Sequence, residues 1–207
     1  MSAVIDAGAS DAGICAVNRK SVLAAVAGIR EDFFLTRRSV RQFSAVPVSD
    51  AEIRRAVRIA ATAPADGDRR FFKVHVFTRR GVIARLLAAH RGAYGFVSEL
   101  RGLAVITTTR PVGPDASERR DMWVDGGFFA MSFVYGLHAQ GLGSVVLNGT
   151  PDDSVLRARV PLADDESVVC LVGFGNLRDR YPVACSARPE VDDILLTHTG
   201  TVRPRLR

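Results

Sequence analysis

The chain has 207 residues, 47% hydrophobic and 24% charged, which fits one globular domain with a substantial core and excludes a wholly disordered chain. The net charge of +6 would by itself suggest an anionic partner such as nucleic acid. However, 26 of the 28 basic residues are arginines, and they are dispersed without forming a basic tract, so no nucleic-acid partner is expected.

The first quarter of the chain predicts an extension followed by two helices. Residues 1–20 carry neither a basic start nor a long apolar run, and they are interpreted as a flexible N-terminal extension of a single domain over residues 21–207. Apolar residues at helical spacing predict a helix within 21–41. A second helix opens with a capping box from Ser49 to Glu52 and ends at a proline.

The remainder mixes strands and helices without strict alternation. Helical patterns cover residues 80–90 and 118–140, a shorter one covers 151–160, and the tail from Tyr181 is irregular. Four stretches are predicted as strands: FKVHVFT, LAVITTT, GSVVLNG and SVVCLVGFGN. The order of elements predicts an α+β fold with helices packed on a central sheet.

Several classes of site and location are not expected. Cys15, Cys170 and Cys185 are far apart and form no CxxC pair, which fits a reducing cytoplasm. The histidines are scattered and there is no HExxH, so no protein-bound metal is expected. Glycines and polar residues interrupt the most apolar stretch, 124–149, which predicts a buried helix and a strand instead of a membrane span.

The stretch FFLTRRSVRQF places Arg37, Arg38 and Arg41 around Ser39. If residues 36–42 form the last helical turn and its exit, Arg37 and Arg41 lie one turn apart on one face. Such a set suits a phosphate monoester, which needs several converging donors and the planar geometry of arginine. The alternative is a solvated helix end, where arginines complement the helix dipole. Spacing alone slightly favours the solvated helix end.

Four segments taken in order favour the phosphate site. They are RRSVRQF, AATAPADGDRRFFKVHVF, GLHAQGLGSVVLNGTP and LVGFGN, and together they resemble the nitroreductase-like flavoprotein family over about residues 30–190. The resemblance implies an α+β fold with a mostly antiparallel central sheet flanked by helices. It also implies an intertwined homodimer that binds FMN non-covalently at the subunit interface.

The resemblance assigns cofactor contacts residue by residue. The residues implied to hold the FMN phosphate and to reach toward the pyrimidine edge of the flavin are Arg37, Arg38, Ser39 and Arg41. Arg188 lies where the family often has a basic residue, late in the chain, that contacts the phosphate.

Two further groups are implied to lie beside the ring system. They are Pro64, Ala65 and Asp66 next to the partner's flavin, and Leu147, Asn148 and Gly149 where a backbone N–H approaches flavin N5.

The sequence departs from the family pattern in the loop after the second helix. An aspartate, Asp66 or Asp68, replaces the usual Asn or His, and the usual QPW or RPW step is Arg70–Phe72. An acid near the flavin would disfavour its anionic reduced form. Phe71 and Phe72 are interpreted as core residues at the start of a strand.

The resemblance implies an FMN-dependent oxidoreductase. NADH or NADPH would deliver hydride to N5 and be replaced by an electron-poor small molecule such as a nitroaromatic or quinone, giving ping-pong kinetics. No catalytic side chain is assigned. Tyr94, Phe96 and Trp123 are candidates to face the substrate, with core packing equally open for each. Two alternatives remain: a specialised biosynthetic flavin dehydrogenase or oxidase, and a catalytically degenerate flavin-binding dimer.

Overall fold

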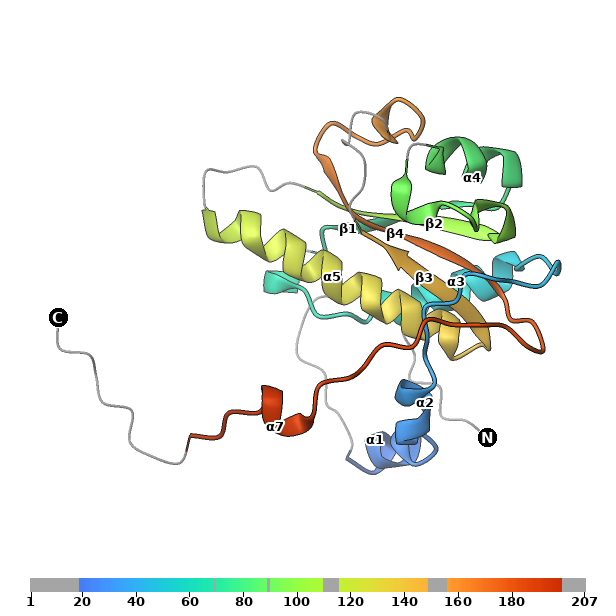
Figure 1. Cartoon of the computed structure of the whole chain (residues 1–207). Helices are drawn as coiled ribbons and strands as arrows, with labels where there is room; N and C mark the ends of the chain where they lie inside the picture. The colour runs from blue at the N-terminus through green and yellow to red at the C-terminus, as the bar shows by residue number, and fades with distance from the viewer. Residues whose placement is uncertain (1–18, 69, 89, 110–115, 149–155, 199–207) are drawn as a thin grey trace.

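The structure is a computed structural model, and it describes residues 19–198 except 69, 89, 110–115 and 149–155. Its strands are β1 (Phe72–Phe77), β2 (Gly102–Thr109), β3 (Leu142–Leu147) and β4 (Glu166–Asn176). They form one sheet in the order β1-β2-β4-β3, and every neighbouring pair is antiparallel (Figure 1). Each strand matches a predicted one, so the predicted α+β fold with an antiparallel sheet is confirmed.

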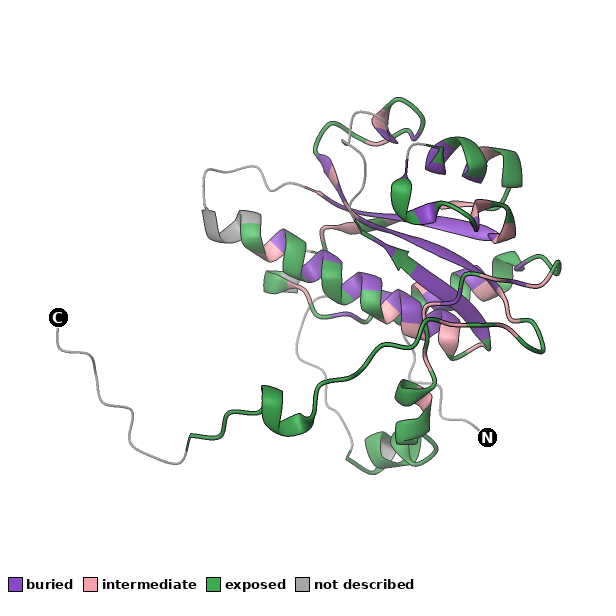
Figure 2. Cartoon of the chain, viewed as in Figure 1, coloured by how far each residue is buried: buried purple, intermediate pink, exposed green. Residues whose placement is uncertain are grey.

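Helices cover both faces of this sheet. They are α3 (Asp50–Ala60), α4 (Arg80–Leu87) and α5 (Ala116–His138). Successive residues of the central strand β2 point to opposite faces. Leu103 and Val105 pack in one core with α4, whereas Ala104 and Ile106 pack in a second core with α3 and α5. The strand is therefore buried on both sides (Figure 2).

The capping box predicted for α3 is present. The Glu52 N–H donates to the Ser49 hydroxyl, and the Ser49 N–H donates to the Glu52 carboxylate at 2.8 Å. The apolar positions Ile53, Ala56 and Ala60 are buried against α5, as the spacing predicts. At the far end of α5 the chain turns through Gly141, whose φ of 75° is readily adopted only by glycine.

The prediction of a single helix within residues 21–41 is wrong. The chain forms two short helices, α1 (Arg19–Val26) and α2 (Glu31–Leu35), with a break at Gly28. Glycine weakens a helix interior, and side chains such as Val26 and Ile29 are exposed, so no packing compensates for the weak position.

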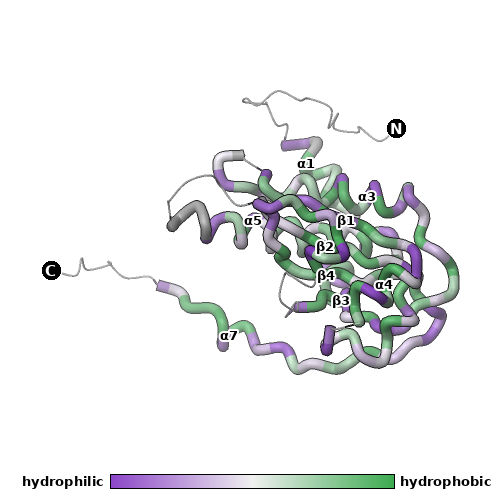
Figure 3. The backbone as a smooth tube through the Cα atoms, turned by 90° about the horizontal axis from the view of Figure 1, so that it is seen from above, coloured by the Kyte–Doolittle hydropathy of each residue, from purple (hydrophilic) through white to green (hydrophobic). Residues whose placement is uncertain are grey.

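The C-terminal tail extends away from the body of the molecule (Figure 1). It is irregular from Tyr181 as predicted, except for one turn of helix, α7 (Val191–Ile194). The tube around α7 has the colour of hydrophobic residues in Figure 3. Ile194, Leu195 and Leu196 of this stretch are exposed. Residues 1–18 of the extension predicted over 1–20, and the first half of the helix predicted for 151–160, lie outside the described residues.

Candidate functional site

The arginine segment is extended and not helical. Helix α2 ends at Leu35, and Ser39 forms a parallel bridge with Ser144 on β3, where the Val40 N–H donates to the Ser144 carbonyl at 2.9 Å. The expectation that residues 36–42 form a helical turn is wrong, because β3 is an edge strand whose free backbone groups pair with this segment.

The extended backbone of the arginine segment places its charged side chains together differently from a helix. Alternate residues point to the same side, so Arg37, Ser39 and Arg41 share one face. Val40 points the other way and is buried in the core. Period two therefore brings Arg37, Ser39 and Arg41 together, whereas Arg38 alternates to the other side and reaches the same cavity with its long side chain.

These residues line a cavity of about 580 Å³, within the roughly 300–1,000 Å³ typical of cofactor sites. Its walls come from the arginine segment, from α2 and α5, and from the tail. The lining residues are Phe34, Arg37, Arg38, Ser39, Arg41, Met131, Tyr135, Ala184, Cys185, Ser186 and Arg188. Five residues that the resemblance assigns to the FMN phosphate, four of them arginines, thus face one space.

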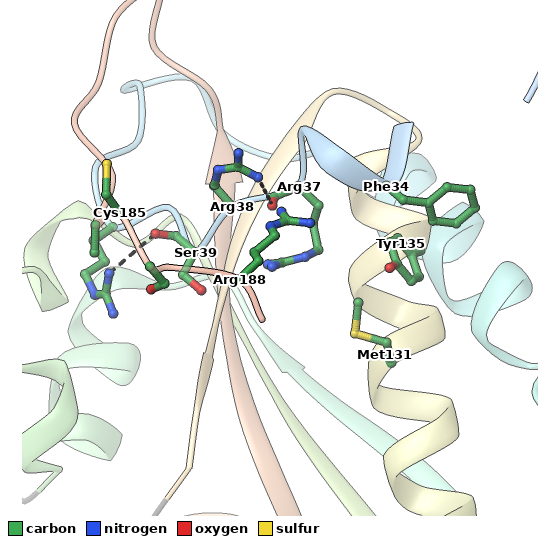
Figure 4. Close-up of a pocket in the computed structure, with 11 residues that line it drawn as sticks. Phe34, Arg37, Arg38, Ser39, Met131, Tyr135, Cys185 and Arg188 are labelled. Carbon is green, nitrogen blue, oxygen red and sulfur yellow. Dashed lines mark hydrogen bonds between the residues drawn. The ribbon is translucent and has the colours of Figure 1, made fainter. Parts of the chain in front are cut away.

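Backbone carbonyls and one ring contact the guanidinium groups of Arg38, Arg41 and Arg188. Arg38 donates to the carbonyls of Leu35 and Arg37, and Arg188 donates to the Leu35 carbonyl at 3.3 Å. Figure 4 shows Arg37, Arg38 and Arg188 gathered in the middle of the cavity. Arg41 lies over the Phe96 ring, 5.8 Å from its centroid.

No acidic side chain neutralises this charge among the described residues that line the cavity. Within the same part of the chain, none of the four guanidinium groups forms an ion pair with a carboxylate. Four like charges therefore converge without compensation, an arrangement that favours an anionic ligand.

The opposite wall of the cavity is apolar and aromatic. Met131 and Tyr135 project from α5, and Phe34 comes from α2 (Figure 4). The Phe34 and Tyr135 rings meet edge to face with centroids 5.4 Å apart. Sequence reasoning missed these residues and Cys185. The signal that could have found Met131 and Tyr135 is their spacing of four on the core helix, which places them on one face.

The loop predicted to lie beside the partner's flavin is outside this cavity in the single chain. Its Asp66 N–H donates to the Asp125 carboxylate of α5 at 3.1 Å, and Asp125 itself is buried. Pro64 and Asp66 are exposed, whereas Ala65 is half-buried. Asp125 thus ties the loop to the middle of α5.

Strand β3 ends at the residues that are predicted to approach flavin N5. Leu147 is buried, Asn148 is exposed, and Gly149 lies outside the described residues. Leu147 follows Ser144 on the same strand by three residues, about 10 Å along it. The two predicted contact regions are thus joined by one strand.

The three candidate substrate-facing aromatics have different environments. Phe96 is buried in the core below Arg41, whereas Tyr94 and Trp123 are exposed. Phe72 stacks on Phe129 of α5 at 4.5 Å and so belongs to the core, as interpreted from the sequence.

The described part of the chain shows neither a metal-binding cluster nor a membrane-spanning helix. No group of three or more His, Cys, Asp or Glu side chains there is placed to hold a metal ion. None of the described helices is both long enough and apolar enough to cross a membrane.

The protein has an α+β fold, and an arginine-lined cavity lies beside the edge strand of its sheet. The nitroreductase family model matches residues 35–94 and 91–176. The chain therefore belongs to the nitroreductase family. No curated protein matches it in sequence.

Solved structures share the fold at low identity. A nitroreductase family protein of Streptococcus pneumoniae is similar with a TM-score of 0.72 and 18% identity, over 81% of this chain and 98% of that chain. An FMN-dependent nitroreductase of Clostridium difficile is similar with a TM-score of 0.66 and 20% identity, over 80% of this chain and 98% of that chain. A Desulfovibrio desulfuricans protein, described as a nitroreductase and solved in complex with FMN, is similar with a TM-score of 0.69 and 20% identity, over 81% and 95%.

Proposed function

We propose that this chain is an FMN-dependent oxidoreductase that uses NADH or NADPH to reduce electron-poor acceptors such as nitroaromatics or quinones. The observation that carries the proposal is the convergence of Arg37, Arg38, Arg41 and Arg188 with Ser39 on one cavity that has no acidic side chain among its described lining residues. Family membership and the FMN-bound relative support the choice of anion.

The residues present fit the phosphate of FMN. A phosphate monoester carries about −1.5 to −2 charges at pH 7 and three acceptor oxygens. Planar guanidinium groups meet such oxygens in a bidentate manner, and the Ser39 hydroxyl adds a neutral donor. Arg41 is already oriented by the Phe96 ring, so less side-chain entropy is lost when it binds the anion.

The chain's other residues would place the ring system. Bound FMN would supply hydride transfer between the nicotinamide and the acceptor. Phe34, Met131 and Tyr135 offer an apolar wall that excludes water from the cavity. Leu147 and Asn148 are the proposed neighbours of the reacting edge, and the Pro64–Asp66 loop is proposed to reach the flavin of a second subunit.

We further propose a homodimer, and an exposed apolar stripe on α5 supports it. Trp123, Val124, Phe128 and Met131 each expose between 38% and 48% of their surface. Val124, Phe128 and Met131 recur at helical spacing and continue into Tyr135 at the cavity. Contiguous apolar surface of this kind marks an interaction face. Because the stripe reaches the cavity, a second copy would close the site.

The arginine variants test the phosphate assignment. Replacing Arg37 with Ala is expected to weaken FMN binding about ten- to hundredfold, because one charge-assisted contact contributes roughly 1.5–3 kcal/mol. Riboflavin, which lacks the phosphate, should bind the variant as it binds the wild type. Flavin fluorescence titration measures both. Arg58→Ala, an exposed arginine at the end of α3, is the matched control. Equal loss of FMN and riboflavin affinity in Arg37→Ala would contradict the assignment.

Reduction tests the chemistry separately. Anaerobic addition of NADH or NADPH to the FMN-loaded protein should remove the oxidised flavin absorbance, and a nitroaromatic or quinone should restore it. Bound FMN that neither nicotinamide reduces would contradict the reductase proposal and favour a degenerate flavin-binding dimer.

A further inference from the structure

Helix α2 leads directly into the arginine segment, yet none of its residues is buried. Its position depends on a few contacts with the last turns of α5. The Phe33 ring lies 5.8 Å from the Tyr135 ring and 5.0 Å from the His138 ring. Because α2 ends two residues before Arg37, contacts that fix the end of α2 also fix the position of the Arg37 backbone.

The imidazole of His138 makes polar contacts with this end of α2. Its Nε2 lies 2.9 Å from the Phe33 carbonyl oxygen and 3.2 Å from the Thr36 hydroxyl oxygen, although the residues are more than 100 positions apart in the sequence. The Thr36 hydroxyl donates to the Asp32 carbonyl at 2.6 Å, so its oxygen accepts from His138. Both partners are acceptors, which requires a hydrogen on Nε2. His138 thereby binds a carbonyl that the end of α2 leaves without a helical partner.

The His138 contact is one of two anchors on either side of the arginines. Thr36 is held by His138, and Val40 is held by the Ser144 carbonyl. Arg37 and Arg38 lie between these anchors, and both line a small cleft together with His138. Loss of either anchor would free one end of this short segment.

We infer that His138 is a positioning residue for the anion site: by fixing the end of α2 it makes Arg37 and Arg38 converge on the cavity. It does not line the cavity itself. The inference rests on the proposed FMN function, since the anion is taken to be the FMN phosphate.

The test compares two substitutions in the full-length protein. His138→Leu removes the donor, whereas His138→Gln keeps an N–H near the position of Nε2. FMN affinity is expected to fall about five- to tenfold in the leucine variant, the effect of a lost hydrogen bond of about 1–1.5 kcal/mol, and to be largely rescued by glutamine. Riboflavin affinity should stay unchanged in both. His198→Leu, the same change at an exposed tail position, is the control.

The outcomes separate the inference from the proposed function. If the wild-type protein does not prefer FMN to riboflavin, the proposed phosphate site fails. If the wild type prefers FMN and His138→Leu keeps the full preference, the positioning role is wrong and the FMN site stands. An equal loss of FMN and riboflavin affinity also overturns the positioning role.

A second variant keeps the inference testable if His138→Leu does not fold. Thr36→Val removes only the hydroxyl partner at an exposed position and should weaken FMN binding about two- to fivefold. Wild-type FMN affinity in Thr36→Val would overturn the inference.

Discussion

The carboxylate of Glu166 is buried at the start of β4 and accepts hydrogen bonds from three side chains. The donors are Lys73 Nζ at 2.8 Å, His75 Nε2 at 2.8 Å and Thr107 Oγ1 at 3.0 Å. Burial by itself would raise the pKa of Glu166, but these hydrogen bonds outweigh it and lower the pKa to about 2. Because the partners belong to β1 and β2, the carboxylate ties three strands together.

This cluster predicts a pH-dependent stability. The pKa of Glu166 is lower in the folded state than its usual 4.5, so its contribution is fully present above about pH 4.5 and is lost as the pH falls toward 2. Glu166→Gln should therefore lower the free energy of unfolding by about 2–3 kcal/mol at pH 7. The difference from wild type should shrink as the pH approaches 2.

Urea unfolding at several pH values measures this difference. Glu190→Gln, at an exposed tail position, should leave stability unchanged. A Glu166→Gln variant as stable as wild type at pH 7 would show that the cluster contributes nothing.

Two cysteines are expected to differ in reactivity. Cys170 is buried in the core, and burial raises its thiol pKa to about 11. Cys185 is exposed and lines the arginine cavity. At neutral pH iodoacetamide should modify Cys185 in the native protein and Cys170 only after denaturation.

Peptide mass mapping of the alkylated protein follows both sites. Added FMN should slow the modification of Cys185 by occupying the cavity. Native Cys170 reacting as fast as Cys185 would contradict the burial argument, and a Cys185 rate unaffected by saturating FMN would place the ligand elsewhere.

At the scale of elements, the contact between α3 and α5 depends on one glycine. A Cβ on Gly136 would lie 2.8 Å from the Ala56 carbonyl oxygen and 3.0 Å from its Cα, both backbone atoms of α3 that move only with the helix. Gly136→Ala is thus expected to lower the free energy of unfolding by about 1–3 kcal/mol. Gly81→Ala in α4 meets nothing within 4 Å and should be neutral or stabilise by up to about 1 kcal/mol.

Thermal or denaturant unfolding of the two alanine variants checks this contrast. The pair is matched because each replaces a helical glycine with the same residue. If Gly136→Ala were as stable as Gly81→Ala, the close helix approach would not limit the packing of α3 on α5.

The elements that could be predicted are those whose signals are local. The capping box of Ser49 and Glu52 marks the start of α3 within four residues, and the apolar strands have residues buried on both sheet faces. The arginine segment could not be predicted in this way. Its extended conformation depends on pairing of Ser39 with Ser144, about 100 residues away. Helical spacing in the flanking sequence gave the wrong conformation, although the clustered arginines do line one cavity.

Which face of α5 forms a wall of the cavity was not predictable from local sequence signals, although Met131 and Tyr135 share a face by their spacing. Periodicity predicted that α5 is a core helix, but it could not show which face remains uncovered in the single chain. Tyr135 and Met131 lie on that face because α3 and the sheet occupy the others. The aspartate in the family loop was visible in the sequence, whereas its anchoring through the buried Asp125 became clear only in the fold.

At the scale of the whole molecule, the exposed stripe on α5 and the apolar tail predict self-association. Light scattering with size-exclusion chromatography should give about twice the 22.4 kDa mass of one chain. Phe128→Glu places a charge in the middle of the stripe and should shift the protein toward the monomer. Ile59→Glu, an exposed apolar position on α3, is a matched control. A wild-type protein that stays monomeric at high micromolar concentration would contradict the dimer.

The extended arginine segment, α5 and the C-terminal tail come from distant parts of the chain and meet at one cavity. The central claim is that this cavity binds flavin mononucleotide through its phosphate. Titration of the purified full-length protein with FMN and with riboflavin, followed by flavin fluorescence, tests it most directly. We expect saturable FMN binding at least tenfold tighter than riboflavin binding, with a preference that weakens at high salt. A protein that binds neither flavin, or binds both equally, would contradict it.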